Sequence, residues 1–484
     1  KMKKMKKIIL IALLLSATIA CEDFEGWNID EKNPSEVPAA FLVTNAQRSF
    51  FRQMTIPSVN SNIFKQMAQH WTTTTYNDET NYNMVGRDIG GNWWGSMYTG
   101  VMIDIVEAKK LIGENELDAG TKANKLAILD LFQSYIWHIV IDTYGDAPYS
   151  EALKGNENLI PKYDDDAAIY DDIMRTIDLA LNSLNASNGS FAGEDLIYNG
   201  DVDSWAKFGN SLKLKMAVRI ADVDAGTAGT AARAAVAAGV LGSNGDNARF
   251  PFETAPPNTN PNWEALVQSG RKDYIIANTF ADIMNTLNDP RSAVFMDDNA
   301  GVPYIGGTYG ASNSYPDFSH VGDLWHTPDL EAIIMSYDEV NFLLAEAAEK
   351  GIIDGGSAAA EGYYKEGIIA SMNYWVPEVD QAGIDNYIAQ ATVAYNSAEW
   401  NKSIGQQKWV ALFGRGFEAW SSWRLLDYPE MNIAAESQES VPRRYIYPND
   451  EPQINGTNYE AAASAIGGDT KATRVFWDVN GVGN

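Results

Sequence analysis

The stretch YDEVNFLLAEAAEK at residues 337–350 indicates the fold class most directly. Five of its residues share one apolar face at i, i+3, i+7, i+10 and i+11, namely Tyr337, Val340, Leu344, Ala347 and Ala348. This spacing predicts an amphipathic helix, and Gly351 supplies its stop. Glu346 and Lys350 stand four residues apart, so we expect them to form an ion pair on the outer face.

Helical spacing of apolar residues recurs along most of the chain, in blocks at 40–70, 93–112, 122–143, 165–184, 202–221, 227–240, 273–287, 330–350, 358–374 and 401–423. Several blocks form pairs with short links, and small residues such as Ala345 allow the close approach that stacked helical hairpins require. A strict repeat of about 34 residues is not seen, and alternating strand patterns are scarce. The sequence therefore predicts an all-α, mainly helical fold of tetratricopeptide-like helix pairs with few short strands.

Long polar segments separate the helical blocks and are rich in glycine, proline and asparagine. They lie at residues 71–92, 241–272, 289–328 and after residue 427. Loops of this length within a compact domain are usually functional or disordered. We therefore expect a single domain over residues 21–484, with its binding site in these insertions.

The amino terminus has the features of a secretory signal. Residues 1–7 contain five lysines, and residues 8–15 form an apolar run that is too short to span a bilayer. The only cysteine, Cys21, directly follows Ala20, and this arrangement resembles a lipobox. We expect residues 1–20 to be removed as a signal peptide. Cys21 would then carry diacylglycerol on its thiol and an acyl chain such as palmitate on its new amino group.

The charge balance limits the possible partners. Loss of residues 1–20, with their five lysines, would take the formal net charge from −28 to −33. Such a surface repels phosphate backbones, so we expect no nucleic-acid partner. A second long apolar stretch is missing, so we expect the lipid to be the only membrane attachment. The acidic Glu22, Asp23 and Glu25 resemble the tag that sends lipoproteins of Bacteroidetes-type bacteria to the cell exterior.

Five motifs carry a resemblance to a known family. In chain order they are Tyr144-Gly145-Asp146-Ala147-Pro148-Tyr149; Asn288-Asp289-Pro290-Arg291; residues 337–349 with Ala345-Glu346-Ala347; Gln407-Lys408-Trp409 followed by Glu418-Ala419-Trp420 and Arg424; and Pro442-Arg443-Arg444 with Tyr447-Pro448 and Glu451. With these motifs in register behind a lipobox, the chain resembles the SusD/RagB outer-membrane nutrient-binding lipoproteins. It departs at Arg424-Leu425, where many members have two arginines, which puts any role of paired arginines in doubt.

The resemblance implies a helical lipoprotein of the outer membrane that faces the exterior and lies as a lid over a SusC-like TonB-dependent transporter. Members of the family bind glycans at the cell surface, and some relatives handle peptides. They are not enzymes. The function expected from the resemblance is therefore capture of oligosaccharides and delivery to the transporter, with a peptide-capturing protein of the same architecture as the alternative.

Two insertions have the composition of a sugar site, which combines aromatic faces with amide, carboxylate or arginine groups. The first is residues 71–92, and the second is residues 303–326, where glycines would give a flexible rim. In the family, the ligand groove is built from loops at these two places. The candidate ligand-binding residues are Trp71, Tyr76, Asn77, Tyr82, Arg87, Tyr309, Tyr315 and Trp325.

Other aromatic residues are assigned to the core. Trp409, Phe413, Phe417 and Trp420 repeat at i, i+4, i+8 and i+11, the spacing of a buried helix face. Trp94 and Tyr98, four residues apart at the start of the next predicted helix, are expected to face the core as well.

Catalytic and metal sites are not indicated. The chain has 64 acidic residues but nothing that selects a glycosidase pair from among them, so a secreted glycoside hydrolase is the weakest alternative. It lacks a nucleophile elbow, a P-loop, a dinucleotide fingerprint and a zinc-type histidine pair. The run from Asp164 to Asp166 could hold calcium, but it also begins a predicted helix, where carboxylates favour the positive end of the dipole. We therefore expect no catalytic residue, no metal and no cofactor.

Overall fold

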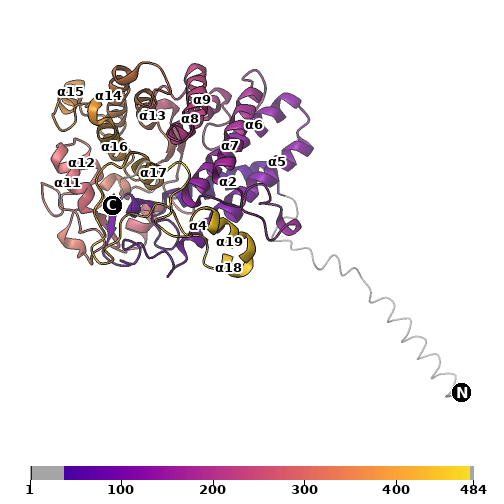
Figure 1. Ribbon diagram of the computed structural model, residues 1–484, viewed down its shortest axis with the longest axis horizontal. Coiled ribbons are helices and arrows are strands. Elements are labelled where there is room, and N and C mark those ends of the chain that lie inside the picture. Colours follow the sequence, from indigo (N-terminus) through magenta and orange to yellow (C-terminus); the bar gives the residue numbers. More distant parts are fainter. Residues whose placement is uncertain (1, 3–36, 480–484) are drawn as a thin grey trace.

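The computed structural model describes residue 2 and residues 37–479, and its helices confirm the predicted fold class (Figure 1). The longer helices are α2 Ala39–Thr55, α4 Ile89–Met97, α5 Ile103–Asn115, α6 Ala119–Tyr144, α7 Asp166–Ser183, α8 Val202–Ile220, α9 Ala225–Ala238, α11 Asn278–Leu287, α13 Tyr337–Glu349, α14 Gly356–Trp375, α15 Gln381–Ile388, α16 Trp400–Ala411, α17 Gly416–Leu426 and α19 Gly456–Ala465. The short ones are α3 Phe64–Met67, α10 Pro261–Trp263, α12 Ser292–Phe295 and α18 Glu451–Ile454. Apart from residue 2, the signal segment lies outside the described residues, and so does Cys21.

Short turns of other helix types lie in the loops or run directly into an α-helix, as they do between α4 and α5. The π-helical turns are η2 Tyr98–Met102 and η5 Glu264–Gln268. The 3-10 turns are η3 Gly155–Glu157, η4 Asn244–Asp246, η6 Tyr315–Asp317, η7 Asp323–His326 and η8 Ser397–Glu399. Among the residues that the structure describes, no helix is both long and apolar enough to cross a membrane.

The helices pack as hairpins, as predicted. α6 packs on α7, α8 on α9 and α13 on α14, and α7 and α13 each also contact α8. In Figure 1 these pairs follow one another along the upper side of the molecule, while the long insertions and short elements gather below them. The hairpins therefore form a scaffold, and the insertions lie to one side of it.

Aspartate caps explain where several scaffold helices begin. The side chains of Asp118, Asp165, Asp201 and Asp224 each accept a hydrogen bond from the backbone N–H three residues later, at the start of α6, α7, α8 and α9. Such a bond pairs one of the N–H groups that a helix start otherwise leaves free. The capping function expected of the run 164–166 is thus confirmed at Asp165.

Helix α13 has no outer face, so the predicted exposed pair of Glu346 and Lys350 is wrong. Glu346 is fully buried, and its carboxylate lies 2.6 Å from Lys408 Nζ of α16. Lys350 pairs instead with Asp222, beyond the end of α8. The reason is that α8, α14 and α16 pack around α13, which leaves no side of the helix for an exposed pair.

The aromatic face that begins at Trp409 belongs to two helices and not to one. The chain turns between α16 and α17, where Gly414 has φ +81° and a Cβ atom would come within 2.0 Å of the Trp325 ring. Only glycine fits this backbone conformation and this close approach. Trp409, Phe413, Phe417 and Trp420 are all buried, so the prediction of a core function is confirmed although that of a continuous helix is not.

Strands are short, as predicted, and join distant parts of the chain. β1 Trp71–Thr73 pairs antiparallel with β3 Tyr274–Ile276, with Trp71 opposite Ile276. β2 Ala248–Phe250 pairs antiparallel with β4 Ala332–Met335. The first pairing ties the insertion at 71–92 to the end of the insertion at 241–272.

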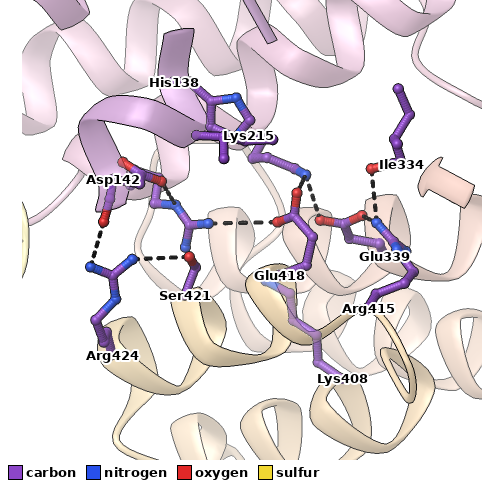
Figure 2. Close-up of polar contacts among 12 residues, drawn as sticks. His138, Asp142, Lys215, Ile334, Glu339, Lys408, Arg415, Glu418, Ser421 and Arg424 are labelled. Atoms are coloured by element: carbon purple, nitrogen blue, oxygen red, sulfur yellow. Dashed lines mark hydrogen bonds and ion pairs between the residues drawn. The ribbon is translucent and has the colours of Figure 1, made fainter. Parts of the chain in front are cut away.

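A network of buried ion pairs connects four scaffold helices (Figure 2). Lys215 Nζ of α8 lies 2.7 Å from Glu418 of α17 and 2.8 Å from Glu339 of α13. One turn later, Arg219 Nε lies 3.1 Å from Asp142 of α6. All five side chains are nearly or completely excluded from water. Because unpaired charges at these positions would be costly, the network favours one arrangement of the four helices.

Candidate ligand-binding cleft

The two predicted insertions lie against each other. Asn81 Nδ2 donates to the Gly310 carbonyl oxygen at 2.9 Å, and Asn313 Nδ2 donates to the Thr73 carbonyl oxygen at 3.0 Å. The rings of Tyr82 and Tyr309 also meet, with centroids 5.9 Å apart. Loops that are more than two hundred residues apart in the sequence therefore form one body.

Four of the eight predicted ligand residues are inside that body. Trp71, Tyr82, Tyr309 and Trp325 are at most 5% exposed. The Tyr309 hydroxyl donates to the Gln66 carbonyl oxygen at 2.8 Å, and the Trp71 ring meets the Trp325 ring edge-on at 6.3 Å. These aromatic residues serve as the apolar core of loops that are poor in aliphatic residues. Direct contact with a ligand would require the loops to move, so the cleft described below does not use them.

Tyr76 and Arg87 lie together at the surface. The Tyr76 side chain is 38% exposed, and its backbone has φ +58°, a conformation that is uncommon outside glycine and is often found at functional sites. The guanidinium carbons of Arg87 and Arg271 lie 4.9 and 5.0 Å from the ring centroid. Arg271 Nη2 also donates to the Tyr76 hydroxyl at 2.6 Å. Two cations thus hold one partly exposed aromatic ring.

A cleft opens around this ring, which we call the Tyr76 cleft. It has about 370 Å³ of open space, and its lining includes Val59, Asn60, Tyr76, Arg87, Glu264, Arg271 and Asp273. It combines an aromatic ring and an aliphatic side chain with amide, carboxylate and guanidinium groups. This mixture and this size are typical of a small-ligand site.

The charges of the Tyr76 cleft are balanced. Three ion pairs surround it, Arg87 with Glu79 at 2.5 Å, Arg271 with Asp273 at 2.5 Å and Arg52 with Glu264 at 2.7 Å. Burial raises the pKa of Glu79, and the hydrogen bond from Arg87 opposes that shift. With each cation matched by a carboxylate, the cleft suits an uncharged polar ligand better than an ionic one.

The remaining predicted residues lie close by. Tyr315 is partly exposed, and its ring stacks on His320 with centroids 3.8 Å apart. Lys272 Nζ lies 5.1 Å from the Tyr315 ring centroid, and Lys272 directly follows Arg271. Asn77 lies next to Tyr76 and shapes its loop, since its backbone oxygen accepts from Asn81 N at 3.0 Å. The side chains that adjoin the cleft therefore extend from Tyr76 through Arg271 and Lys272 to Tyr315.

Arg271 and Asp273 were not predicted. Arg271 lies at the end of the insertion at 241–272 and Asp273 directly follows it, and this insertion was recognised as a long loop but contains few aromatic residues. The available signal was the charged run Arg271-Lys272-Asp273 just before a strand that pairs with β1. The strand pairing, which a local pattern does not reveal, carries these side chains to Tyr76.

Within the described residues, one group of carboxylates has the spacing of a metal site. Oxygen atoms of Asp146, Asp165 and Asp166 lie within 4.8 Å of one another. However, Asp165 caps α7, and Asp146 Oδ1 accepts from Asp166 N at 3.0 Å. Burial raises the pKa of Asp166 to about 7 and that of Asp146 to about 6. These carboxylates serve the start of α7, and we assign no ion to them.

Comparison with known proteins supports a binding function. A family model of the SusD-like type, described as starch-binding and associating with the outer membrane, matches residues 31–448. No curated protein matches the chain at a significant level.

Several solved structures share the fold. A protein described as chitin-binding is 27% identical, with a TM-score of 0.80 over 91% of this chain and 100% of its own. A chitin-binding SusD homologue from Flavobacterium johnsoniae is 26% identical, with a TM-score of 0.77 over 91% and 99%. A SusD homologue from Bacteroides thetaiotaomicron is 25% identical, with a TM-score of 0.76 over 92% and 100%. The chain is thus similar to these proteins over nearly its whole described length.

Proposed function

Because the chain belongs to the SusD-like family of starch-binding proteins that associate with the outer membrane, we propose that it captures uncharged oligosaccharides in the Tyr76 cleft. The single observation that carries this proposal is the partly exposed Tyr76 ring, with the guanidinium groups of Arg87 and Arg271 within about 5 Å of its centroid. Sugar rings present C–H faces to aromatic side chains and hydroxyl groups to arginine and carboxylate groups. The cleft offers both kinds of group within one small volume.

Charge balance favours a glycan over a peptide as the ligand. A free peptide terminus or charged side chain needs an unpaired group of opposite charge to replace its lost hydration. The cations and carboxylates that surround the Tyr76 cleft are already paired with one another. The two relatives described as chitin-binding support the same choice.

Titration calorimetry against a panel of oligosaccharides and peptides tests this proposal. We expect binding to at least one glycan and an affinity loss of about tenfold in Tyr76→Ala, because an aromatic contact with a ligand contributes about that much. Tyr363→Ala is the matched control, since Tyr363 is a partly exposed tyrosine of α14, outside the insertions. Binding of peptides alone, or equal affinity in Tyr76→Ala and the parent protein, would contradict the proposal.

We also propose that the protein is held at the outer membrane by a lipid on Cys21, faces the exterior and hands its cargo to a SusC-like TonB-dependent transporter. The family description supports the membrane association. Metabolic labelling with an alkyne fatty acid tests the anchor, and label should enter the parent protein but not Cys21→Ala. Purification of the tagged protein in mild detergent tests the partner, and a transporter-sized β-barrel protein should copurify with it. Unlabelled parent protein would contradict the anchor, and purification without a barrel protein would contradict the partnership.

A further inference from the structure

A second open cavity, which we call the Trp375 basin, lies where the end of the insertion at 289–328 meets the end of α14. It has about 540 Å³ of open space. Its lining includes Asp329, Leu330, Glu331, Tyr374 and Trp375. It shares no lining residue with the Tyr76 cleft, so it is a separate place for a ligand.

Two aromatic rings of the basin meet at right angles. The ring planes of Tyr374 and Trp375 are 90° apart, and their centroids are 4.8 Å apart. Trp375 is held from the inside by Trp325, on which it stacks with centroids 5.8 Å apart, and by Phe295 at 5.4 Å. Both Tyr374 and Trp375 nevertheless remain partly exposed. The basin therefore has aromatic side chains that are fixed in place and open in part to a ligand.

Carboxylate groups form the polar part of the lining. The Glu331 side chain is 30% exposed, and its Oε1 accepts from the Tyr374 hydroxyl at 2.6 Å and lies 3.4 Å from Arg249 Nη1. Because both contacts use Oε1, the other oxygen of Glu331 has no partner among the described residues. Asp329 is exposed and has no ion pair or hydrogen bond within the described part of the chain. Two carboxylates thus offer acceptors that the protein itself does not use.

The charge of the Trp375 basin is unbalanced, unlike that of the Tyr76 cleft. Its described lining residues include two carboxylates and no lysine, arginine or histidine. Arg249 lies outside the lining and reaches only Glu331. The net charge of −28 adds to the negative potential. The basin is therefore suited to a cation.

The aromatic rings decide which kind of cation fits. An organic ammonium group is attracted both by carboxylates and by the faces of tryptophan and tyrosine rings. A hard metal ion such as Ca²⁺ instead takes about six or more oxygen ligands, and two carboxylates beside two rings do not supply them. The combination of groups in the Trp375 basin therefore indicates an ammonium group.

We propose that the Trp375 basin binds the protonated amino group of a 2-amino sugar. The carboxylates of Asp329 and Glu331 accept hydrogen bonds from the ammonium group, and the aromatic side chains attract its charge and contact the C–H face of the sugar ring. The inference rests on the proposed function, since it adds amino sugars to the glycans that this protein captures.

The Trp375 basin and the Tyr76 cleft meet at the short helix α10. Pro261, the first residue of α10, lines the cleft. The side chain of Asn260, directly before it, donates to the carbonyl oxygen of Leu330 in the basin at 2.5 Å. Different residues of one oligosaccharide can therefore occupy the two places.

The test compares two hexasaccharides by calorimetry in mildly acid buffer, where amino sugars are protonated. The hexamer of β-1,4-linked glucosamine and cellohexaose have the same linkage and length, and differ at C2 in having an ammonium or a hydroxyl group. We expect the full-length protein to prefer the glucosamine hexamer by about fivefold at about 150 mM salt, which screens the attraction of distant charges. Acetylation of its amino groups should remove the preference, because it removes the charge.

Three substitutions test the groups that we assign to the ammonium ion. Asp329→Asn and Glu331→Gln each remove one charge and keep the size of the side chain. Each should lower the preference to about twofold, and the double variant should abolish it. Trp375→Leu removes a ring and should lower the preference to about threefold. The preference is a ratio of two affinities of the same variant, so a general weakening of glycan binding does not change it.

Asp323→Asn is the matched control, because Asp323 belongs to the same insertion, its side chain is 99% exposed and it does not line the basin. It should keep the full preference. Equal affinity of the parent protein for the two hexamers, or a preference that persists in the folded double variant, would overturn the ammonium assignment and leave oligosaccharide capture intact. A lysine hexapeptide that binds as tightly as the glucosamine hexamer would overturn the assignment to a sugar. Failure to bind any oligosaccharide would overturn both this inference and the proposed function.

Discussion

Ion pairs are used differently in the buried network and in the Tyr76 cleft. In the network, Lys215 and Glu418 are 1% and 6% exposed, and both are fully engaged by other helices. In the cleft, Arg87 and Arg271 are 34% and 49% exposed. Pairing between buried charges favours one helix arrangement, whereas pairing between half-exposed charges holds donors in place and leaves part of each available. We therefore expect the buried network to determine the stability of the protein and the ion pairs of the Tyr76 cleft to determine ligand binding.

Glu418 offers the strongest test of this division. Glu418→Gln leaves Lys215 and Arg219 with less negative charge in a buried site, and breaking such a pair costs about 3–5 kcal/mol. We expect a loss of that size in the free energy of unfolding, measured by urea denaturation. Glu361→Gln is the control, because Glu361 forms an exposed pair with Lys365 within α14 and its loss should cost less than about 1 kcal/mol. Similar losses in the two variants would refute the division.

The pH dependence of stability separates carboxylates that are buried with a cation from those that are buried without one. Burial alone would raise the pKa of Glu418, but Lys215, Arg415 and Arg219 lower it to about 2. Its contribution is present above its unfolded pKa of about 4.5 and is lost as pH falls towards 2. Burial raises the pKa of Asp166 from 3.8 to about 7. The folded protein then holds a proton that the unfolded chain releases, so this contribution is lost as pH rises from about 4 to 7.

Asp166→Asn should therefore lose less stability between pH 4 and pH 7 than the parent protein does. Urea midpoints at pH 4, 5.5 and 7 measure the difference. Asp171→Asn, an exposed change on the same helix, should follow the parent protein. If Asp166→Asn and the parent protein have parallel profiles, Asp166 is already ionised across this range in the folded state.

Arg271 tests the expectation that the half-exposed ion pairs of the cleft determine ligand binding. Arg271→Ala removes one of the two groups that hold the Tyr76 ring and one donor to the ligand, so we expect a fall in glycan affinity of about fivefold. Because the side chain is half exposed, the unfolding free energy should change by less than about 0.5 kcal/mol. Arg175→Ala, which removes an exposed arginine from a pair on α7, should change neither quantity. A large loss of unfolding free energy in Arg271→Ala would contradict this prediction, because it would show that Arg271 stabilises the fold as the buried ion pairs do.

The same comparison shows what the sequence could predict. Apolar spacing identified α13 and its neighbours, because helix periodicity is local. It misjudged Glu346, because the lysine that pairs with it belongs to α16. Loop composition selected Tyr76 and Arg87, which the structure brings together at the cleft, and their function in ligand binding stays a prediction. It could not separate Tyr76 from Tyr82, because Tyr82 is buried by a ring from the second insertion, and it missed Arg271, which strand pairing brings to the site.

Salt dependence is the smallest expected effect, and it distinguishes the ligand classes. Since the charges around the Tyr76 cleft are paired and the proposed ligand is neutral, raising the salt concentration from about 50 to 500 mM should change glycan affinity by less than about twofold. The net charge of −28 makes this a demanding test, because a cationic ligand drawn by the overall field would bind much more weakly at high salt. Calorimetry at the two salt concentrations measures the change. A steep fall in affinity would show that the protein recognises charge, and the ligand would then have to be sought among basic peptides.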